Sequence, residues 1–379
     1  MKFVDEFRDG KLARAAAAAI RREASPERVY RLMEFCGGHT HAIFRYGLED
    51  LLPDHVEMVH GPGCPVCVLP IGRVDQAIRL ALDHNVILCT YGDMLRVPGA
   101  KRMTLMKARA EGADVRMVYS ATDALRIARE YPDREVVFFA IGFETTTPPT
   151  AVILKQAQAA KLENFFVFCN HVLTPSALIA LLDDPQVRPE DAPRLDGFVG
   201  PSHVSTVIGS QAFEFCPERY QRPVVIAGFE PLDVLQSILM LVRQLNEDRC
   251  EVENQYRRVV TREGNPIALA LMDEVFELRE TFEWRGLGMV PRSALRLRGT
   301  YAAFDAERRY GIEQQAIPDN KGCECPSILR GLLRPTDCKL FAKACTPDNP
   351  LGSCMVSSEG ACAAYYSYGR FRNQPVGAP

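Results

Sequence analysis

Short apolar runs alternate with stretches of helical periodicity over the first 230 residues, and this alternation restricts the possible folds more than any other feature. The apolar runs lie at residues 29–35, 55–60, 85–90, 115–119, 135–142, 165–171, 196–201 and 223–229. Amphipathic patterns separate most of them, at 74–83, 121–131, 150–161 and 176–184. Strands that alternate with helices indicate parallel sheets covered by helices. The sequence therefore predicts an α/β fold.

The order of these runs also predicts the domain organisation. They divide into two sets of four, so we expect two similar parallel-sheet α/β domains, at about 1–125 and 126–230. Long amphipathic patterns at 233–247 and 267–280 predict helices. After residue 318 the chain is rich in cysteine, glycine and proline, as is typical of a region organised by a metal centre. Residues 231–379 are therefore expected to form a helical segment and a cysteine-rich iron–sulfur domain.

Charge and hydropathy exclude several classes of protein. The net charge is only −3, so the composition does not indicate a basic surface for binding nucleic acid. The chain contains no apolar run long enough to span a membrane, and its N-terminus lacks the pattern of a secretory signal. We expect a cytoplasmic protein that binds neither nucleic acid nor membranes. In that reducing compartment, its 13 cysteines favour metal ligands or redox thiols over structural disulfides.

Polar or glycine-rich motifs follow almost every apolar run. In open parallel sheets, ligands bind beyond the carboxyl ends of the strands, where such loops converge. We therefore expect one crevice between two domains, lined by Cys36, His39, His41, Cys64, Cys67, Glu144, Thr145, His171, Ser202, His203 and Glu230.

The first cysteine group consists of the motifs CGGHTH, which begins at Cys36, and GPGCPVC, which contains Cys64 and Cys67. A structural zinc site is one interpretation, because Cys36 and a histidine could complete four ligands. A thioredoxin-like pair is the second, although the helical pattern resumes only near Val74. The third is a site where soft thiolates hold iron and exchange electrons with it.

The second cysteine group lies near the C-terminus. Cys338, Cys345, Cys354 and Cys362 have the spacing C-x6-C-x8-C-x7-C, which suits a [4Fe–4S] cluster and also tetrahedral zinc. A further pair, Cys323 and Cys325, forms a C-x-C motif upstream. A dithiol beside a cluster allows electrons to pass between the cluster and a disulfide, so the surplus pair favours the cluster over zinc.

Taken together, FCGGHTH, GPGCPVC, IGFETTTP, GPSHVSTVIG, the C-x-C motif and the C-terminal cysteines resemble the HypD family of hydrogenase maturation proteins. The resemblance covers nearly the whole chain. It implies two α/β domains and a third domain that carries a [4Fe–4S] cluster. It also implies a scaffold on which, with the chaperone HypC, the Fe(CN)2CO group of [NiFe] hydrogenase is assembled. Cyanide would arrive from the partners HypF and HypE.

The same resemblance implies roles for individual residues. Cys36 would hold the iron together with a cysteine of HypC, and His39 and His41 would support that site or handle protons. Cys64 and Cys67 would be redox thiols. Electrons would run from the cluster through the C-x-C pair and the GPGCPVC pair to the iron.

Other assignments remain open. Cys323 or Cys325 could replace one of the four cluster ligands. An iron–sulfur thiol–disulfide oxidoreductase without an assembly role would explain every cysteine pair, but it would leave CGGHTH and the GFETT loop unused. A zinc-binding scaffold without redox chemistry is the other rival. Glu144 and the following threonines allow either a nucleotide-binding loop or the cap of a helix that starts near Thr150, and the chain has no P-loop motif.

Overall fold

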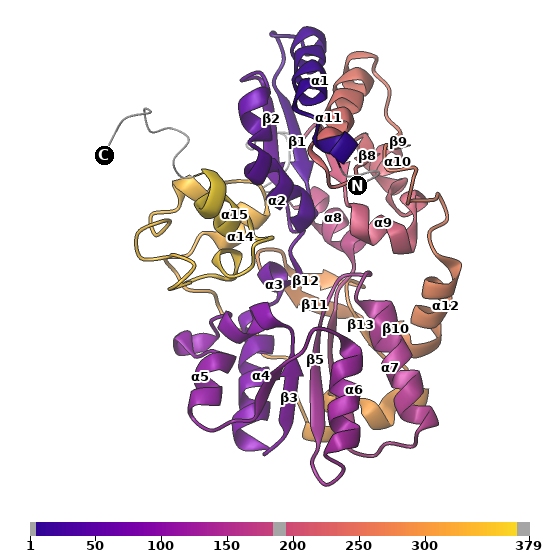
Figure 1. Cartoon of the computed structure of the whole chain (residues 1–379), viewed down its shortest axis with the longest axis vertical. Helices are drawn as coiled ribbons and strands as arrows, with labels where there is room; N and C mark the ends of the chain where they lie inside the picture. The colour runs from indigo at the N-terminus through magenta and orange to yellow at the C-terminus, as the bar shows by residue number, and fades with distance from the viewer. Residues whose placement is uncertain (1–4, 185–194, 370–379) are drawn as a thin grey trace.

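The computed structural model describes residues 5–184 and 195–369. Two parallel β-sheets form the framework of the molecule, and the cysteine-rich segment, yellow in Figure 1, lies against one side of them. No helix within the described ranges has both the length and the hydropathy needed to cross a membrane. The predicted α/β class with two parallel sheets is confirmed.

The first sheet has five strands in the order β2 (Val56–His60), β1 (Tyr30–Glu34), β7 (Gly197–Gly200), β8 (Val224–Ile226) and β9 (Val252–Asn254). All of its pairings are parallel. The helices around it are α1 (Gly10–Glu23), α2 (Gly37–Tyr46), α9 (Ser202–Ile208), α10 (Phe215–Tyr220) and α11 (Pro231–Asn246). Helices α1 and α11 contact one another, and apolar side chains of both helices and of the sheet form one buried cluster.

The second sheet has four parallel strands in the order β4 (Val115–Met117), β3 (Ile87–Thr90), β5 (Val136–Gly142) and β6 (Phe165–His171). Its neighbours along the chain are α4 (Ile71–Asp83), α5 (Leu105–Ala110), α6 (Ala121–Glu130), α7 (Thr147–Ala159) and α8 (Thr174–Asp183). Alternate residues of β5 enter two different apolar clusters, with Phe139 in one and Phe138 in the other. Because side chains alternate between the faces of a strand, both faces of this sheet are buried, which explains its nearly continuous apolar strands.

All eight predicted strands are present, but their predicted grouping is wrong. Residues 30–60 and 197–254 build the first sheet, whereas residues 87–171 build the second. A boundary at 125 would cut through α6 and separate β3 and β4 from β5 and β6. The physical reason is the long-range pairing of β1 with β7, in which Leu32 lies opposite Gly197. The chain leaves the first sheet after β2 and returns to it only at β7.

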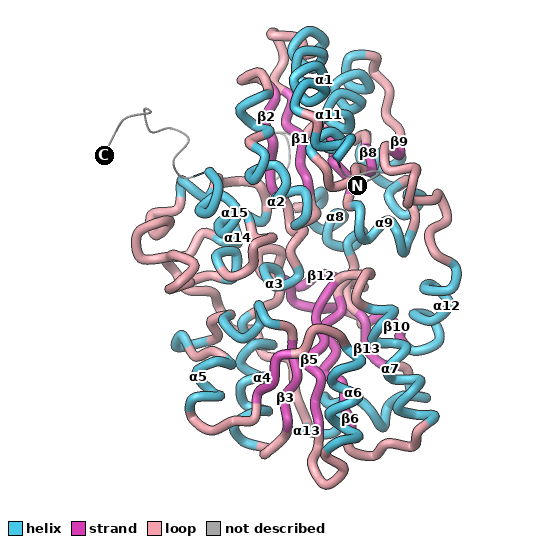
Figure 2. Tube along the Cα trace, in the orientation of Figure 1, coloured by secondary structure: helices cyan, strands magenta, loops and turns pink. Residues whose placement is uncertain are grey.

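After β9, the chain forms smaller elements. Helix α12 (Pro266–Val275) ends earlier than the predicted helix at 267–280, because β10 (Phe276–Leu278) follows directly and pairs with β13 (Leu295–Leu297). Strands β11 (Thr281–Trp284) and β12 (Gly288–Pro291) form a second antiparallel pair. Helix α13 (Ala306–Tyr310) follows this pair and contacts β6 of the second sheet. The cysteine-rich segment consists mainly of loops (Figure 2), with the short helices α14 (Cys325–Leu329) and α15 (Ala361–Ala364).

A buried ion pair ties α4 to the C-terminal part of the chain. Arg73 is only 3% exposed, bonds Asn170 Oδ1 at 2.5 Å and pairs with Glu307, which also pairs with Arg279 at 2.9 Å. Replacing Arg73 with methionine should lower the free energy of unfolding by about 3 kcal/mol, because the carboxylate of Glu307, whose side chain is only 15% exposed, would lose one of its two cations. Urea denaturation measures this change.

Arg126 provides the matched control. It pairs with Glu130 at 2.6 Å, but its side chain is 60% exposed. Arg126→Met should change the free energy of unfolding by less than about 0.5 kcal/mol, as is usual for surface pairs. Equal effects of the two substitutions would show that burial does not decide the strength of these pairs.

Candidate metal and thiol site

The loops that follow β1 and β2 lie side by side. These strands are paired in parallel, so their carboxyl ends meet, and Glu34 lies opposite His60. The N–H of Gly37 donates to the carbonyl of Gly63 at 3.1 Å. A Cβ added to Gly63 would lie 2.3 Å from the backbone nitrogen of Cys36, so only glycine permits this approach. The predicted proximity of CGGHTH and GPGCPVC is therefore confirmed.

Cys64 and Cys67 form a disulfide, and both residues are buried. Cys64 is the N-cap of the short helix α3 (Pro65–Val68), and its sulfur accepts a hydrogen bond from the N–H of Cys67 at 3.2 Å. The expectation that helical structure resumes only near Val74 is thus wrong. The pair lies at the start of a helix, as in thioredoxin-like sites. In this disulfide state, neither sulfur is a thiolate that could bind zinc.

Cys36 is a free cysteine and only 6% exposed. Burial, followed by the negative charges of Glu359 and Glu34, raises the pKa of its thiol to about 12, although the backbone N–H groups of Gly38 and His203 favour the thiolate. At neutral pH, Cys36 is therefore protonated. A metal cation that bound its sulfur would have to displace the proton.

A buried carboxylate supports the Cys36 loop from behind. Glu34 accepts hydrogen bonds from the Cys36 N–H at 3.0 Å, from His60 Nδ1 at 2.7 Å and from the hydroxyl of Thr40. Burial lowers the pKa of His60, but the hydrogen bond and charge of Glu34 outweigh it, so the net shift is upward. The sequence interpretation missed Glu34 and His60. Their position as the last residues of two adjacent strands was the available signal.

The histidines of CGGHTH point to different surroundings. His39 is buried, and its Nε2 lies 3.0 Å from the carbonyl oxygen of Gly228 and 2.9 Å from the hydroxyl of Ser202. Burial lowers its pKa, so His39 is a neutral donor to the carbonyl. The ring of His41 lies edge-on to Tyr368, with 5.3 Å between ring centroids, and its buried Nδ1 has no hydrogen-bond partner in the described part of the chain.

The second sheet carries a separate group of predicted residues. Glu144 accepts hydrogen bonds from the N–H and the hydroxyl of Thr174, both at 2.9 Å. His171 Nε2 lies 2.9 Å from the hydroxyl of Thr150, and burial lowers the pKa of His171 to about 4. These contacts belong to the second sheet, whereas Cys36, His39, Ser202 and His203 gather at the first. That all of these residues line one crevice stays a prediction.

The remaining predicted residues take structural positions. Glu230 is the N-cap of α11 and pairs with Arg8, with Glu230 Oε1 at 2.8 Å. Thr145 is partly buried directly before the N-cap of α7. Thr146 occupies the N-cap position of α7, but its hydroxyl makes no capping bond; the hydroxyls of Thr146 and Thr147 each donate to the carbonyl of Phe143 at 3.1 Å. A threonine therefore stands at the predicted cap, although α7 begins at Thr147 rather than near Thr150 and the capping hydrogen bond is missing.

Glu144 should make the stability of the fold depend on pH. Burial raises its pKa from 4.5 to about 7. Since the folded state then holds a proton that the unfolded state releases, stability falls as the pH rises through this range. Between pH 5.5 and 8, the free energy of unfolding should fall by about 2 kcal/mol more in the wild type than in Glu144→Gln. Urea denaturation at both pH values measures this difference.

Glu163 is an exposed glutamate suited to the control for this experiment. Glu163→Gln should leave the pH dependence of the wild type unchanged. A Glu144→Gln profile parallel to that of the wild type would contradict the raised pKa.

Most sulfurs of the second cysteine group gather around Cys325. Its thiol is the largest cause of the raised pKa of the Cys323 and Cys362 thiols, and it also contributes to the raised pKa of Cys345. Cys325, Cys345, Cys354 and Cys362 belong to one buried apolar cluster, and Cys323 and Cys338 pack against it. A Cβ added to Gly352 would lie 2.4 Å from the sulfur of Cys323 and 2.6 Å from that of Cys325, so glycine lets the backbone approach both sulfurs.

The chemistry of these donors can be tested against the expected cluster. Soft thiols in a loop-rich segment are the donors that iron–sulfur clusters use. Within residues 5–184 and 195–369, however, no three His, Cys, Asp or Glu side chains are arranged as a complete metal site. The thiol donors therefore fit an iron–sulfur cluster. Because Cys325 lies at the centre of the group, it is a candidate for one of the four ligands.

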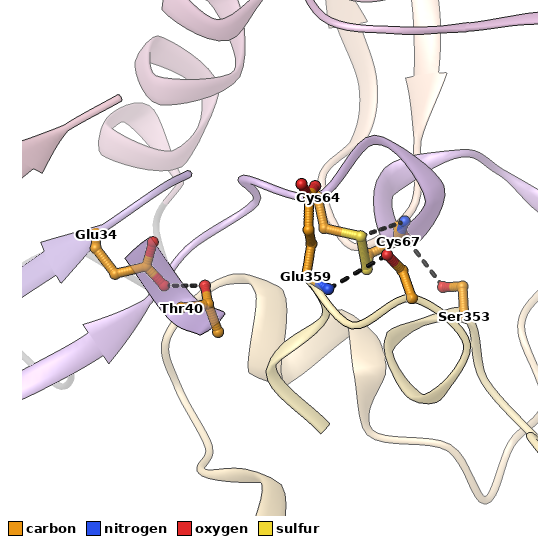
Figure 3. Close-up of a disulfide and its surroundings, with 7 residues drawn as sticks. Glu34, Thr40, Cys64, Cys67, Ser353 and Glu359 are labelled. Carbon is orange, nitrogen blue, oxygen red and sulfur yellow. Dashed lines mark hydrogen bonds between the residues drawn. A yellow bond between two sulfur atoms is a disulfide. The ribbon is translucent and has the colours of Figure 1, made fainter. Parts of the chain in front are cut away.

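The cysteine-rich segment also touches the first site. The hydroxyl of Ser353 donates to the carbonyl of Cys67 at 3.0 Å (Figure 3). Cys354 follows Ser353 directly in the sequence. A Cβ added to Gly37 would lie 2.3 Å from Cβ of Glu359. The two cysteine groups, nearly 300 residues apart in sequence, therefore meet at the Cys64–Cys67 disulfide.

Comparison with known proteins agrees with this arrangement. Residues 11–369 match a family described as "HypD: Hydrogenase formation hypA family". The chain is 66% identical over 376 residues to the hydrogenase maturation factor HypD of Azotobacter vinelandii, and 62% identical over 376 residues to that of Cupriavidus necator, with 99% of each chain covered. It is 48% identical over 373 residues to the Escherichia coli protein, covering 97% of this chain and 98% of the relative. The chain therefore belongs to the HypD family of hydrogenase maturation factors.

Proposed function

We propose that this chain acts with HypC as the scaffold on which the Fe(CN)2CO group of [NiFe] hydrogenase is assembled, in the cytoplasm. One observation carries the proposal. The loop that holds the buried free thiol of Cys36 is hydrogen-bonded to the loop that holds the Cys64–Cys67 disulfide, and the cysteine-rich segment bonds the carbonyl of Cys67. An isolated metal site would not require a redox-active neighbour, and an isolated redox pair would not require a third, separately held thiol.

Cys36 would bind the incoming iron, which is the cargo of the scaffold. Its backbone N–H is held by Glu34, and Glu34 is itself held by His60, so the loop is fixed before iron arrives. Iron binding would convert the buried thiol to a thiolate and release its proton. A cysteine of HypC would be the second protein ligand. His39 and His41 would support the loop.

Cys64 and Cys67 would serve the transfer of cyanide. HypE would present cyanide as a thiocyanate, R–S–CN, made with HypF upstream. The reduced pair would release it: two thiols and R–S–CN would yield R–SH, HCN and the Cys64–Cys67 disulfide. The carbon of the cyanide would then bind the iron. Resetting the pair would require two electrons and two protons, which explains why a source of electrons must reach this disulfide.

Cys338, Cys345, Cys354 and Cys362 would hold a [4Fe–4S] cluster, with Cys323 and Cys325 as the neighbouring dithiol. When bound, such a cluster supplies single electrons at low potential. In the alternative ligand set, Cys323 or Cys325 replaces one of these four cysteines. The gathering of sulfurs around Cys325 supports this alternative. Glu144, whose carboxylate is bonded to Thr174 at the end of the second sheet, would have no direct contact with the iron or the cluster.

Anaerobic purification with iron, zinc and sulfide analysis tests this function. We expect brown protein with about four iron and four sulfide per chain. Colourless protein that contains zinc would contradict the redox role and would favour a zinc-binding scaffold. An iron–sulfur protein that never gains a further iron with HypC would instead be the alternative, a thiol–disulfide oxidoreductase without an assembly role.

A further inference from the structure

The Cys64–Cys67 disulfide cannot be reached from outside the protein. Cys64 is 3% exposed and Cys67 is fully buried. A protein that reduced this disulfide by direct contact would have to unfold the loop around it. Electrons must therefore enter the molecule elsewhere and reach the disulfide through the interior.

A cavity of about 290 Å³ is a place where electrons can enter the protein. Cys323, Cys325 and Gly352 form one wall, and the loop at 98–102 forms another. Cys323 is partly exposed, whereas Cys325 is buried. Gly352 is followed by Ser353, which bonds the carbonyl of Cys67. The same short segment thus faces the cavity at one residue and the disulfide at the next.

The rim of this cavity is positively charged. Residues 96–110 contain five basic side chains and no acidic one. Lys101 and Arg102 are exposed and line the cavity. No ion pair involves either of them within the described residues. The carboxylate that lines the cavity, Asp319, already pairs with Arg285 at 3.0 Å.

The rim loop is held in an unfavourable backbone conformation. Lys101 and Arg102 both have positive φ, at 54° and 61°. Such conformations cost on the order of 1–3 kcal/mol each for residues other than glycine, and they persist only where neighbouring contacts enforce them. Arg102 bonds Asn349 Oδ1 at 2.5 Å, and Lys107 donates to the Arg102 carbonyl at 2.9 Å. The first contact fastens the basic loop to the cysteine-rich segment, and the second holds the loop itself in place.

We propose that the basic rim of this cavity is the docking site of an acidic one-electron carrier protein that reduces the chain through the sulfurs at its wall. The inference rests on the proposed redox function. Two reduced carriers would each lose one electron. The Cys64–Cys67 disulfide would take up both electrons and two protons from solvent and become two thiols. Charge complementarity at a rim chiefly speeds association and makes it dependent on salt.

The test uses the anaerobically purified protein with its metal content intact. A reduced, strongly acidic [2Fe–2S] ferredoxin is mixed with the wild type or with Lys101→Glu, and alkylation with mass spectrometry counts the thiols at Cys64 and Cys67. We expect reduction of the variant to be at least about tenfold slower at low ionic strength. The difference should disappear near 0.5 M salt, where the Debye length is only a few Å.

Lys161→Glu is the matched control, because Lys161 is also exposed and also has a positive φ, at 51°, but does not line the cavity. It should be reduced at the wild-type rate. Equal rates and equal salt dependence for Lys101→Glu and the wild type would overturn the docking site. Reduction by a dithiol carrier such as a thioredoxin, but not by the ferredoxin, would overturn the class of partner.

A separate chemical reduction shows whether the proposed docking site or the proposed redox function is wrong. Dithionite with a small mediator requires no protein docking, and it should produce the Cys64 and Cys67 thiols equally in all variants. If it produces none in the wild type, the thiol function itself is wrong.

Discussion

Replacing Cys36 with alanine should abolish the uptake of the additional iron that the chain binds together with HypC. Cys64 and Cys67 are joined to each other, so Cys36 is the free thiol at this pair of loops. Loss of a direct ligand should weaken iron binding by more than about 100-fold, because loss of a supporting residue alone costs 10- to 100-fold. Iron analysis of the HypC complex after gel filtration measures the change.

The cluster region should be unaffected by this substitution, so the sulfide content should stay at the wild-type value. Cys250→Ala is the control, since Cys250 is a free, partly exposed cysteine outside both cysteine groups. It should retain the additional iron. Full iron content in Cys36→Ala would show that another residue holds the cargo.

The second large effect is expected from replacing Cys64 or Cys67 with alanine. Either substitution should leave iron bound at Cys36 but remove the cyanide attached to it, because one thiol alone cannot deliver two electrons and close a disulfide. The double variant should be no worse than either single variant, since residues that act as a unit show non-additive effects. The measurement is the cyanide released from the isolated HypC complex after acid denaturation.

The control for this experiment is again Cys250→Ala, which should retain its cyanide. Normal cyanide in Cys64→Ala and Cys67→Ala would mean that the disulfide is structural. The electron supply would then have to reach the iron by another route.

The sequence predicted local features of the fold better than long-range ones. Eight of the nine strands of the two parallel sheets were found, because buried strands carry apolar runs that can be recognised locally. Strand β9, which is only partly buried, was missed. The pairing of Leu32 with Gly197 joins segments 165 residues apart, and no local pattern encodes it. For that reason, the two sheets were predicted from the order of the strands along the chain, and that grouping is wrong.

The candidate site shows the same limit. Cys36, Cys64 and Cys67 stood out because of their motifs, and the parallel pairing of β1 and β2 placed them together as expected. Glu34 and His60 look like ordinary ends of apolar strands, and only the structure shows that they form a buried pair behind Cys36. Likewise, the spacing of the C-terminal cysteines does not reveal that Cys325 lies at the centre of the group.

The infrared spectrum of the complex with HypC, isolated from cells that also contain HypE and HypF, tests the central claim most directly. Metal-bound CN and CO absorb in a spectral region where protein groups do not. We expect bands from both ligands in the wild-type complex and none in Cys36→Ala. A wild-type complex that contains the additional iron but shows no CN or CO bands would contradict an assembly scaffold and would leave a thiol–disulfide oxidoreductase as the function of this chain.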